Sequence, residues 1–257
     1  MNWGEIDTSK PSLELIEKLI LDDYRFIRND ITELTTGAPL YHALLSGIAM
    51  GDGKTHSSYK KAKVNKDVGD SAAEVLQEKG LLRVEKAKNI FTSWSENETV
   101  DNKLLFTTPF YRFWFAFVSP LFKGIRDGDY KEVQQRFTNH QNEFVQLTFI
   151  ELSQEFLKLQ FKEDIITEIG SYWDRKSELD IFAKTKSGKI IVGSCKYTNK
   201  KINKSELNRL HDICETTKIK ADIFVIFSKK GFSSELKSLK SEELKLFTIK
   251  NFKSLVD

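Results

Sequence analysis

The sequence contains little of what secreted and membrane proteins depend on. Among its 257 residues there are two cysteines, Cys195 and Cys214, which are too few for a disulfide framework and favour a reducing compartment. There is no run of about 18 apolar residues, the length that a membrane-spanning helix needs. Residues Met1–Asp7 are neither basic nor apolar enough for a signal peptide. We therefore expect a cytoplasmic protein without a membrane span.

Histidine and net charge are also scarce. The four histidines are spread along the chain without the spacing of a zinc site. The formal net charge is only +3, so any binding to nucleic acid must come from local basic patches rather than from the charge of the whole protein. The segment Gly51–Thr55 (Gly-Asp-Gly-Lys-Thr) lacks the glycine that a phosphate-binding P-loop needs five residues before Gly53, where Ile48 stands. We therefore predict no nucleotide site there.

The region from residue 40 to residue 89 has the pattern of a winged helix, a relative of the helix-turn-helix. Apolar spacing predicts helices over 40–49, 57–64 and about 67–79, the last capped by Asp67 or Asp70, followed by a strand over 81–85 and a basic turn, Lys86–Asn89. A local set of lysines predicts a DNA-binding surface. Its members are Lys54, Lys60, Lys61, Lys63 and Lys66. The alternative is a helical packing module, with solvated lysines, that binds only protein.

The stretch Leu104–Tyr130 is unusually rich in phenylalanine, tyrosine and tryptophan. Such residues form stacking platforms for single-stranded nucleic acid in some proteins. The helical periodicity of the stretch favours a second interpretation, in which the rings form a packed core. We predict that residues 101–135 connect a winged-helix domain (1–100) to an α/β domain (136–257).

The C-terminal part alternates strands and helices, which predicts an α/β fold. Expected elements include strands over 178–183, 190–197, 221–227 and 244–249, and a helix over 204–216. Strand alternation places Asp180 on one face with Phe182, and Ser194 on one face with Lys196. A carboxylate and an ammonium group within apolar strands are costly to bury unless they are paired or used.

Three pieces of the chain carry a family resemblance: Pro109–Pro120, Ile169–Ala183 and Val192–Tyr197. In this order they resemble the domain-of-unknown-function family that forms the C-terminal part of archaeal-type P-loop ATPases. That family is part of the PD-(D/E)XK, or restriction-endonuclease-like, superfamily. The resemblance implies a winged-helix module followed by a mixed β-sheet flanked by helices.

The resemblance also implies a nuclease site. Asp180 and Lys196 stand in the catalytic positions, with Mg²⁺ or Mn²⁺ as the cofactor. Ser194, the third residue of the implied site, replaces the glutamate of the family pattern, and a hydroxyl is a poor Mg²⁺ ligand. The compensating carboxylate is expected from Glu178, beside Asp180, or from a preceding helix, as Glu151 before Glu143. Cys195 is expected to point away from Lys196, into the core.

Three functions follow from these observations. The first is a nuclease-like DNA-binding protein with a degenerate metal site, in which Asp180 and Lys196 form a leftover ion pair. The alternative is an active Mg²⁺- or Mn²⁺-dependent DNA endonuclease or exonuclease that uses the same two residues. The third is an interaction module for a separate P-loop ATPase, because we see no room for an ATPase domain before the winged helix.

Overall fold

The computed structural model describes residues 6–7, 9–87 and 101–255. The described chain divides into two compact units. The first contains residues up to Glu85 and Asp101–His140, and the second contains the remaining described residues. Two sequence-based predictions fall partly outside the described residues: the absence of a signal peptide over Met1–Asp7 and the basic turn Lys86–Asn89. In the described part of the chain, no helix combines the length and the apolar character that a bilayer span requires.

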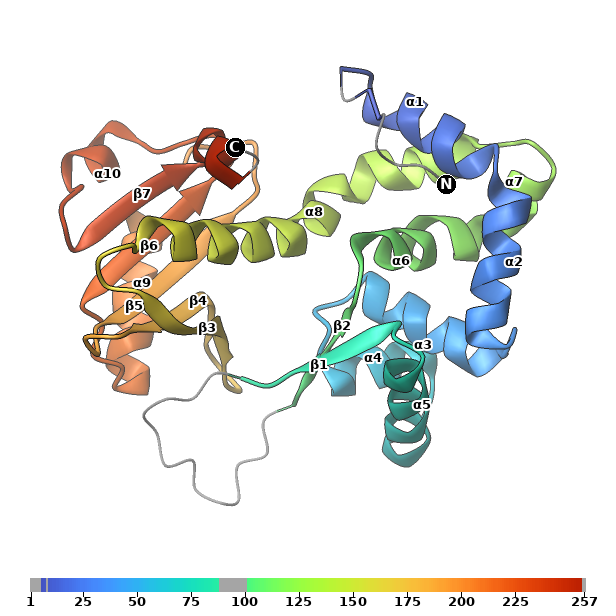
Figure 1. Ribbon diagram of the computed structural model, residues 1–257, viewed down its shortest axis with the longest axis horizontal. Coiled ribbons are helices and arrows are strands. Elements are labelled where there is room, and N and C mark those ends of the chain that lie inside the picture. Colours follow the sequence, from blue (N-terminus) through green and yellow to red (C-terminus); the bar gives the residue numbers. More distant parts are fainter. Residues whose placement is uncertain (1–5, 8, 88–100, 256–257) are drawn as a thin grey trace. The chain divides into compact units, whose positions relative to one another are not determined.

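The first unit is mainly helical (Figure 1). Its N-terminal helices lead into three further helices and a two-stranded antiparallel sheet, and Lys54 forms an additional antiparallel bridge with Lys103. The third of these helices is capped by Asn65, whose side chain accepts a hydrogen bond from Val68 N, and not by Asp67 or Asp70 as predicted. The elements are α1 (Ser12–Ile16), η2 (Glu17–Leu21), α2 (Tyr24–Thr35), α3 (Pro39–Ala49), α4 (Thr55–Ala62), α5 (Lys66–Glu78), β1 (Leu82–Glu85) and β2 (Lys103–Phe106).

The aromatic stretch packs inside the first unit. Trp114 stacks on Tyr24 at a centroid distance of 5.7 Å, and Phe115 stacks on Phe106 at 6.0 Å. Trp114, Phe115 and Phe117 are buried, so the interpretation as core is confirmed and a stacking platform made from these rings is wrong. The elements are α6 (Pro109–Phe113), η3 (Trp114–Val118), η4 (Ser119–Leu121) and α7 (Phe122–Arg126).

The second unit is a mixed α/β sheet, as expected from the sequence. The strand order is β3-β4-β5-β6-β7; the first three strands are antiparallel, whereas β5, β6 and β7 are parallel. The long helix α8 (Lys131–Gln160) begins in the first unit and continues into the second. The other elements are β3 (Ile166–Trp173), β4 (Glu178–Thr185), β5 (Ile190–Lys196), α9 (Lys204–Thr217), β6 (Ile223–Ser228), α10 (Ser234–Ser238), β7 (Leu244–Thr248) and η5 (Ile249–Leu255).

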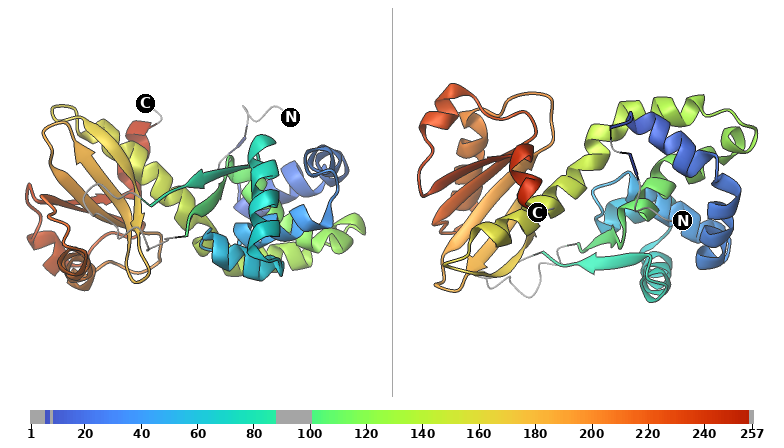
Figure 2. Two further views of the ribbon diagram at one scale, coloured as in Figure 1. Left: turned by 90° about the horizontal axis from the view of Figure 1, so that it is seen from below. Right: turned by 45° about the horizontal axis from the view of Figure 1, so that its top comes forward.

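Helices cover both faces of this sheet (Figure 2). On one face, Leu207 and Leu210 of α9 pack with Leu236 of α10 against the strands. On the other face, Phe156 of α8 and Phe252 of η5 pack against a different set of strand residues. This double cover explains why β5 and β6 are nearly continuous apolar runs.

Candidate functional site

The candidate site lies at the end of β5, where a β-bulge changes the direction of β4. The register between β3 and β4 shifts between Gly170 and Tyr172, where β4 has one residue more than β3, at Asp180. Leu179 and Phe182, three residues apart, therefore join the same core cluster. Strict alternation, on which the predicted facing of Asp180 rests, does not hold across this bulge. Bulges commonly redirect a side chain in this way.

The Asp180 carboxylate lies against the backbone of β5. Its Oδ2 accepts a hydrogen bond from Cys195 N at 2.8 Å and lies 3.5 Å from Ser194 Oγ. Burial raises the pKa of Asp180, and this effect outweighs the opposing effects of the Cys195 N–H and of Lys196. The carboxylate is thus held in the structure without a directly paired cation.

A second carboxylate, Glu206 of α9, lies on the other side of Ser194. Its Oε1 lies 2.6 Å from Arg209 Nη2, 2.9 Å from Arg209 Nε and 3.4 Å from Lys196 Nζ. Burial by itself raises the pKa of Glu206, but the hydrogen bonds with Arg209 and Ser194 and the nearby Lys196 outweigh it and lower the pKa. Glu206 is therefore ionised at neutral pH and neutralises cations on two elements.

The expected ion pair between Asp180 and Lys196 is wrong. Among the described residues, the carboxylate paired with Lys196 is that of Glu206. The sequence analysis missed Glu206 and Arg209, although their spacing of three residues on one helix was a readable signal of an ion pair. It did not show that this pair would meet Lys196, because that contact depends on how α9 packs on the sheet.

Two glutamines of α8 complete the hydrogen bonding at this end of the sheet. The amide of Gln146 donates to Cys195 O at 2.7 Å and accepts from Tyr197 N at 2.9 Å. Gln154 donates to the backbone carbonyl of Asp180 at 2.9 Å. The sequence analysis named Glu151 and Glu143 as helix carboxylates for the site; the α8 side chains brought to this end are instead Gln146 and Gln154, and the roles of the two glutamates stay predictions.

The residues at the site do not fit the predicted Mg²⁺ or Mn²⁺ ion. These hard cations need several oxygen ligands, most often carboxylates. One oxygen of Asp180 already accepts a backbone N–H, and Glu206 is held by Arg209 and Lys196. Within the described ranges, no group of three or more histidine, cysteine, aspartate or glutamate side chains is arranged to hold a metal. Glu178 takes part through its backbone carbonyl, which accepts from Arg209 Nη1 at 3.3 Å.

Cys195 points into the core, as predicted. It packs with Phe149 and Phe227 on the α8 face, opposite the face of Ser194 and Lys196. Burial raises the pKa of its thiol well above the usual value, so the sulfur stays protonated at neutral pH. Cys195 is therefore a core residue rather than a nucleophile.

The predicted DNA-binding lysines lie around α4. Lys60 and Lys61 are in its last turn, Lys63 ends the helix in the left-handed conformation with φ 58°, and Lys66 begins α5. Lys60, Lys66 and His56 also line a hollow of about 430 Å³. The exposed face of α5 is acidic, by contrast. It carries Asp67, Asp70, Glu74 and Glu78.

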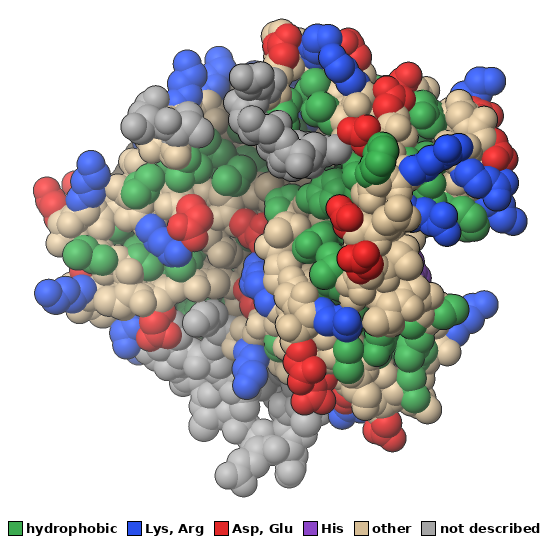
Figure 3. All heavy atoms as spheres, turned by 45° about the vertical axis from the view of Figure 1, so that its right-hand side comes forward, with side chains coloured by type: hydrophobic (Ala, Val, Ile, Leu, Met, Phe, Trp, Pro, Cys, Tyr) green, Lys and Arg blue, Asp and Glu red, His purple; other side chains and the backbone are tan. Residues whose placement is uncertain are grey.

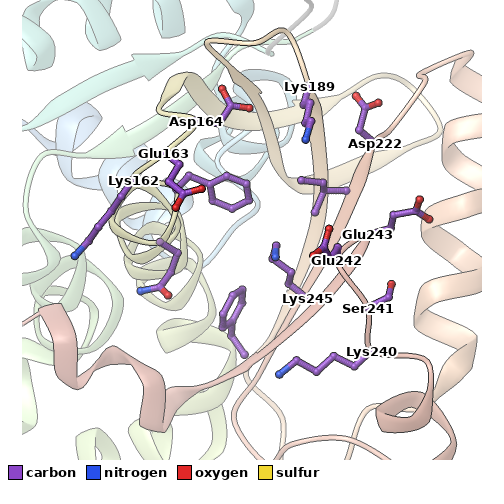
Figure 4. A pocket seen from close by; sticks show the side chains of 14 residues that line it. Lys162, Glu163, Asp164, Lys189, Asp222, Lys240, Ser241, Glu242, Glu243 and Lys245 are labelled. Carbon is purple, nitrogen blue, oxygen red and sulfur yellow. The ribbon is translucent and has the colours of Figure 1, made fainter.

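Another hollow, of about 860 Å³, lies at the opposite end of the sheet, where β5, β6 and β7 begin (Figure 4). Charges of both signs alternate around it. The lysines are Lys162, Lys189, Lys240 and Lys245, and the carboxylates are Glu163, Asp164, Asp222, Glu242 and Glu243. Five carboxylates against four lysines give no field that attracts a polyanion, so we place no nucleic-acid site there.

Comparison with known proteins connects the candidate site to one family. Residues 114–209 match the family model DUF234, described as archaea bacterial proteins of unknown function. The comparisons with curated proteins and with solved structures gave no match. The DUF234 match begins in η3 and ends at Arg209, so it includes the site residues Asp180, Ser194, Lys196 and Glu206.

The buried charge of Asp180 leads to a testable prediction about stability. The raised pKa means that the folded state binds this proton more tightly than the unfolded state, whose ordinary pKa is 3.8. Ionisation therefore costs stability above the folded pKa, and the cost disappears as the pH falls below 3.8. Asp180→Asn keeps the shape without the charge. We expect this variant to melt at a higher temperature than the wild type at neutral pH.

Thermal unfolding of both proteins at a series of pH values checks this expectation. The difference in melting temperature should shrink as the pH falls, because the wild-type carboxyl becomes protonated. Glu206, with its lowered pKa, is present in both proteins and contributes to both curves. A variant that melts below the wild type by the same amount at every pH would show that the hydrogen bonds of the carboxylate, and not its charge, dominate.

Proposed function

We propose that the protein is a nuclease-like DNA-binding protein that holds duplex DNA without cutting it. One observation carries the proposal: the charges at the site where a nuclease would cut are satisfied within the chain. Lys196 and Arg209 pair with Glu206, and Asp180 accepts the backbone N–H of Cys195. A lysine held by a neighbouring carboxylate is not free to activate water, and the residues do not fit a catalytic metal.

The order of elements in each unit supports the finer fold assignments in this proposal. We assign residues 39–106 to a winged helix, because three helices are followed by an antiparallel hairpin that bridges back to Lys54. We assign the second unit to the restriction-endonuclease-like fold, because an antiparallel β3-β4-β5 meander is extended by the parallel strands β6 and β7.

The distribution of charge indicates how the first unit meets DNA. In a helix-turn-helix, the last helix enters the major groove. Here the corresponding helix, α5, exposes carboxylates that phosphates repel. The lysines of α4 and of the turn that follows it are the groups suited to DNA, and lysines at helix ends contact phosphates rather than bases. On the face shown in Figure 3, basic and acidic side chains are interspersed, so binding depends on such local sets. We therefore propose backbone binding with little sequence preference.

A combined binding and cleavage assay tests this function. The protein is incubated with supercoiled plasmid, linear duplex and single strands in Mg²⁺ and in Mn²⁺. We expect retarded mobility of the duplex in a gel and fully intact DNA after the protein is removed. Cleavage that is lost in Lys196→Ala and in Asp180→Ala would show an active nuclease and overturn the proposal. Cleavage that survives both substitutions would indicate a contaminating enzyme, and the preparation would be repurified and assayed again.

A further inference from the structure

Three donor groups surround one carboxylate at the end of β5. Arg209 contacts Glu206 through Nε and Nη2, Lys196 contacts it through Nζ, and the hydroxyl of Ser194 hydrogen bonds to it. The side chains of Lys196 and Arg209 are 32% and 38% exposed, whereas that of Glu206 is 14% exposed. The two cations thus reach solvent around an anion of the same chain.

More lysines lie along the loops that adjoin this cluster. The loop after β5 carries Lys200 and Lys201, and the loop after β6 carries Lys229 and Lys230. The loops run together, because Lys229 N donates to Lys196 O at 3.1 Å and Ile202 bridges Phe232. In the described part of the chain, no ion pair involves Lys200, Lys201 or Lys230. This edge, at the carboxyl ends of parallel strands, is where α/β sheets commonly bind ligands.

We propose that Ser194, Lys196 and Arg209 form a phosphate-binding cradle that Glu206 fills in the free protein, and that a backbone phosphate of duplex DNA displaces Glu206. The inference rests on the proposed function and extends it, because it gives the second unit its own DNA contact. Arginine binds a carboxylate and a phosphate with the same planar fork, so one can take the place of the other. Once Glu206 swings out, two cations face the ligand.

The strength of the internal pairing determines which source of phosphate succeeds. The lowered pKa of Glu206 shows that the carboxylate is well held, so a single phosphate ion competes poorly with it. A DNA backbone brings several linked phosphates, and the lysines of the two loops hold the neighbours while one enters the cradle. Duplex DNA should therefore bind where inorganic phosphate does not.

Glu206→Gln tests the cradle, with Glu235→Gln as the matched control. Both substitutions remove one negative charge near this edge, but Glu235 pairs with Lys204 at 3.7 Å and does not contact the cradle. Fluorescence anisotropy with a short duplex gives the affinities. We expect Glu206→Gln to tighten binding about tenfold and Glu235→Gln to change it less than about twofold. Arg209→Gln should weaken binding, and inorganic phosphate at constant ionic strength should not displace the duplex from the wild type.

The outcomes separate this inference from the proposed function. Equal effects of Glu206→Gln and Glu235→Gln would overturn the cradle and leave general electrostatics. Thermal stabilisation of Glu206→Gln by inorganic phosphate, without tighter duplex binding, would assign the cradle to free phosphate and also overturn the inference. A wild type that binds no duplex at low salt would overturn the proposed function itself.

A measurement on the unaltered protein covers the case in which a variant does not fold. The Nε–H resonance of Arg209, assigned by its loss in Arg209→Lys, should shift when duplex is added. The signal reports on the guanidinium group directly, because its hydrogen-bond partner changes from carboxylate to phosphate. A resonance that stays in place while the protein is saturated with duplex would overturn the cradle.

Discussion

Replacing Lys60, Lys61 and Lys63 together by glutamate will lower the affinity for duplex DNA by at least about a hundredfold at moderate salt. Each substitution removes a phosphate contact and introduces a charge that phosphates repel. The three lysines are exposed at the end of α4, so their replacement leaves the core unchanged. Anisotropy titrations at one fixed salt concentration give the ratio of dissociation constants, and circular dichroism confirms that the variant is folded.

A second triple variant controls for net charge. Lys18, Lys123 and Lys131 are also exposed residues of the first unit, but they lie on η2, α7 and α8. Replacing them by glutamate changes the charge of the protein by the same amount. We expect a loss of about threefold or less for this control. Similar losses in both variants would show that α4 has no special role in binding.

Gly193→Ala will destabilise the second unit by about 3 kcal/mol. Gly193 lies in the middle of β5, paired with Ile181 on one side and Val225 on the other. A Cβ atom at this position would lie 2.8 Å from Val225 O and closer still to Val225 Cγ2, within a sheet that is covered on both faces. The strands must separate to accept the methyl group. We expect the melting temperature of this unit to fall by about 10 °C in a calorimetric scan.

A double-mutant cycle identifies the cause of this loss. Val225→Ala removes the nearest side-chain atom, so Gly193→Ala should cost about 1 kcal/mol less in the Val225→Ala background than in the wild type. Part of the cost remains, because the carbonyl of Val225 is still close. The same strand separation would disturb the contact of Asp180 with Cys195, two residues further along β5. Additive effects of the two substitutions would place the strain elsewhere.

The elements of the second unit could largely be predicted from the sequence, because local pattern determines them. The expected helix over 204–216 corresponds to α9, Lys204–Thr217, and the strand over 244–249 corresponds to β7, Leu244–Thr248. Buried strands and amphipathic helices have apolar periods that single segments reveal. The acidic face of α5 was likewise visible in the sequence, but its meaning depended on which helix would face DNA.

The arrangement of the site could not be predicted in the same way. The bulge at Asp180 depends on the pairing of two strands, and alternation within one strand does not reveal it. The partner of Lys196 comes from α9, whose position on the sheet is set by apolar contacts of Leu207 and Leu210. Ser194 indicated a missing carboxylate, and the structure brings Glu206 to its hydroxyl. Such contacts between distant segments arise from packing rather than from local sequence.

The salt dependence of duplex binding by the wild-type protein tests the central claim most directly. Two duplexes of unrelated sequence are titrated over a range of salt concentrations in the presence of Mn²⁺, and the DNA is recovered afterwards. We expect the logarithm of the binding constant to fall linearly with the logarithm of salt concentration, with a slope of about −4 for both sequences, and the recovered DNA to be intact. The absence of binding at low salt, or nicked DNA in a reaction that Lys196→Ala abolishes, would contradict the account.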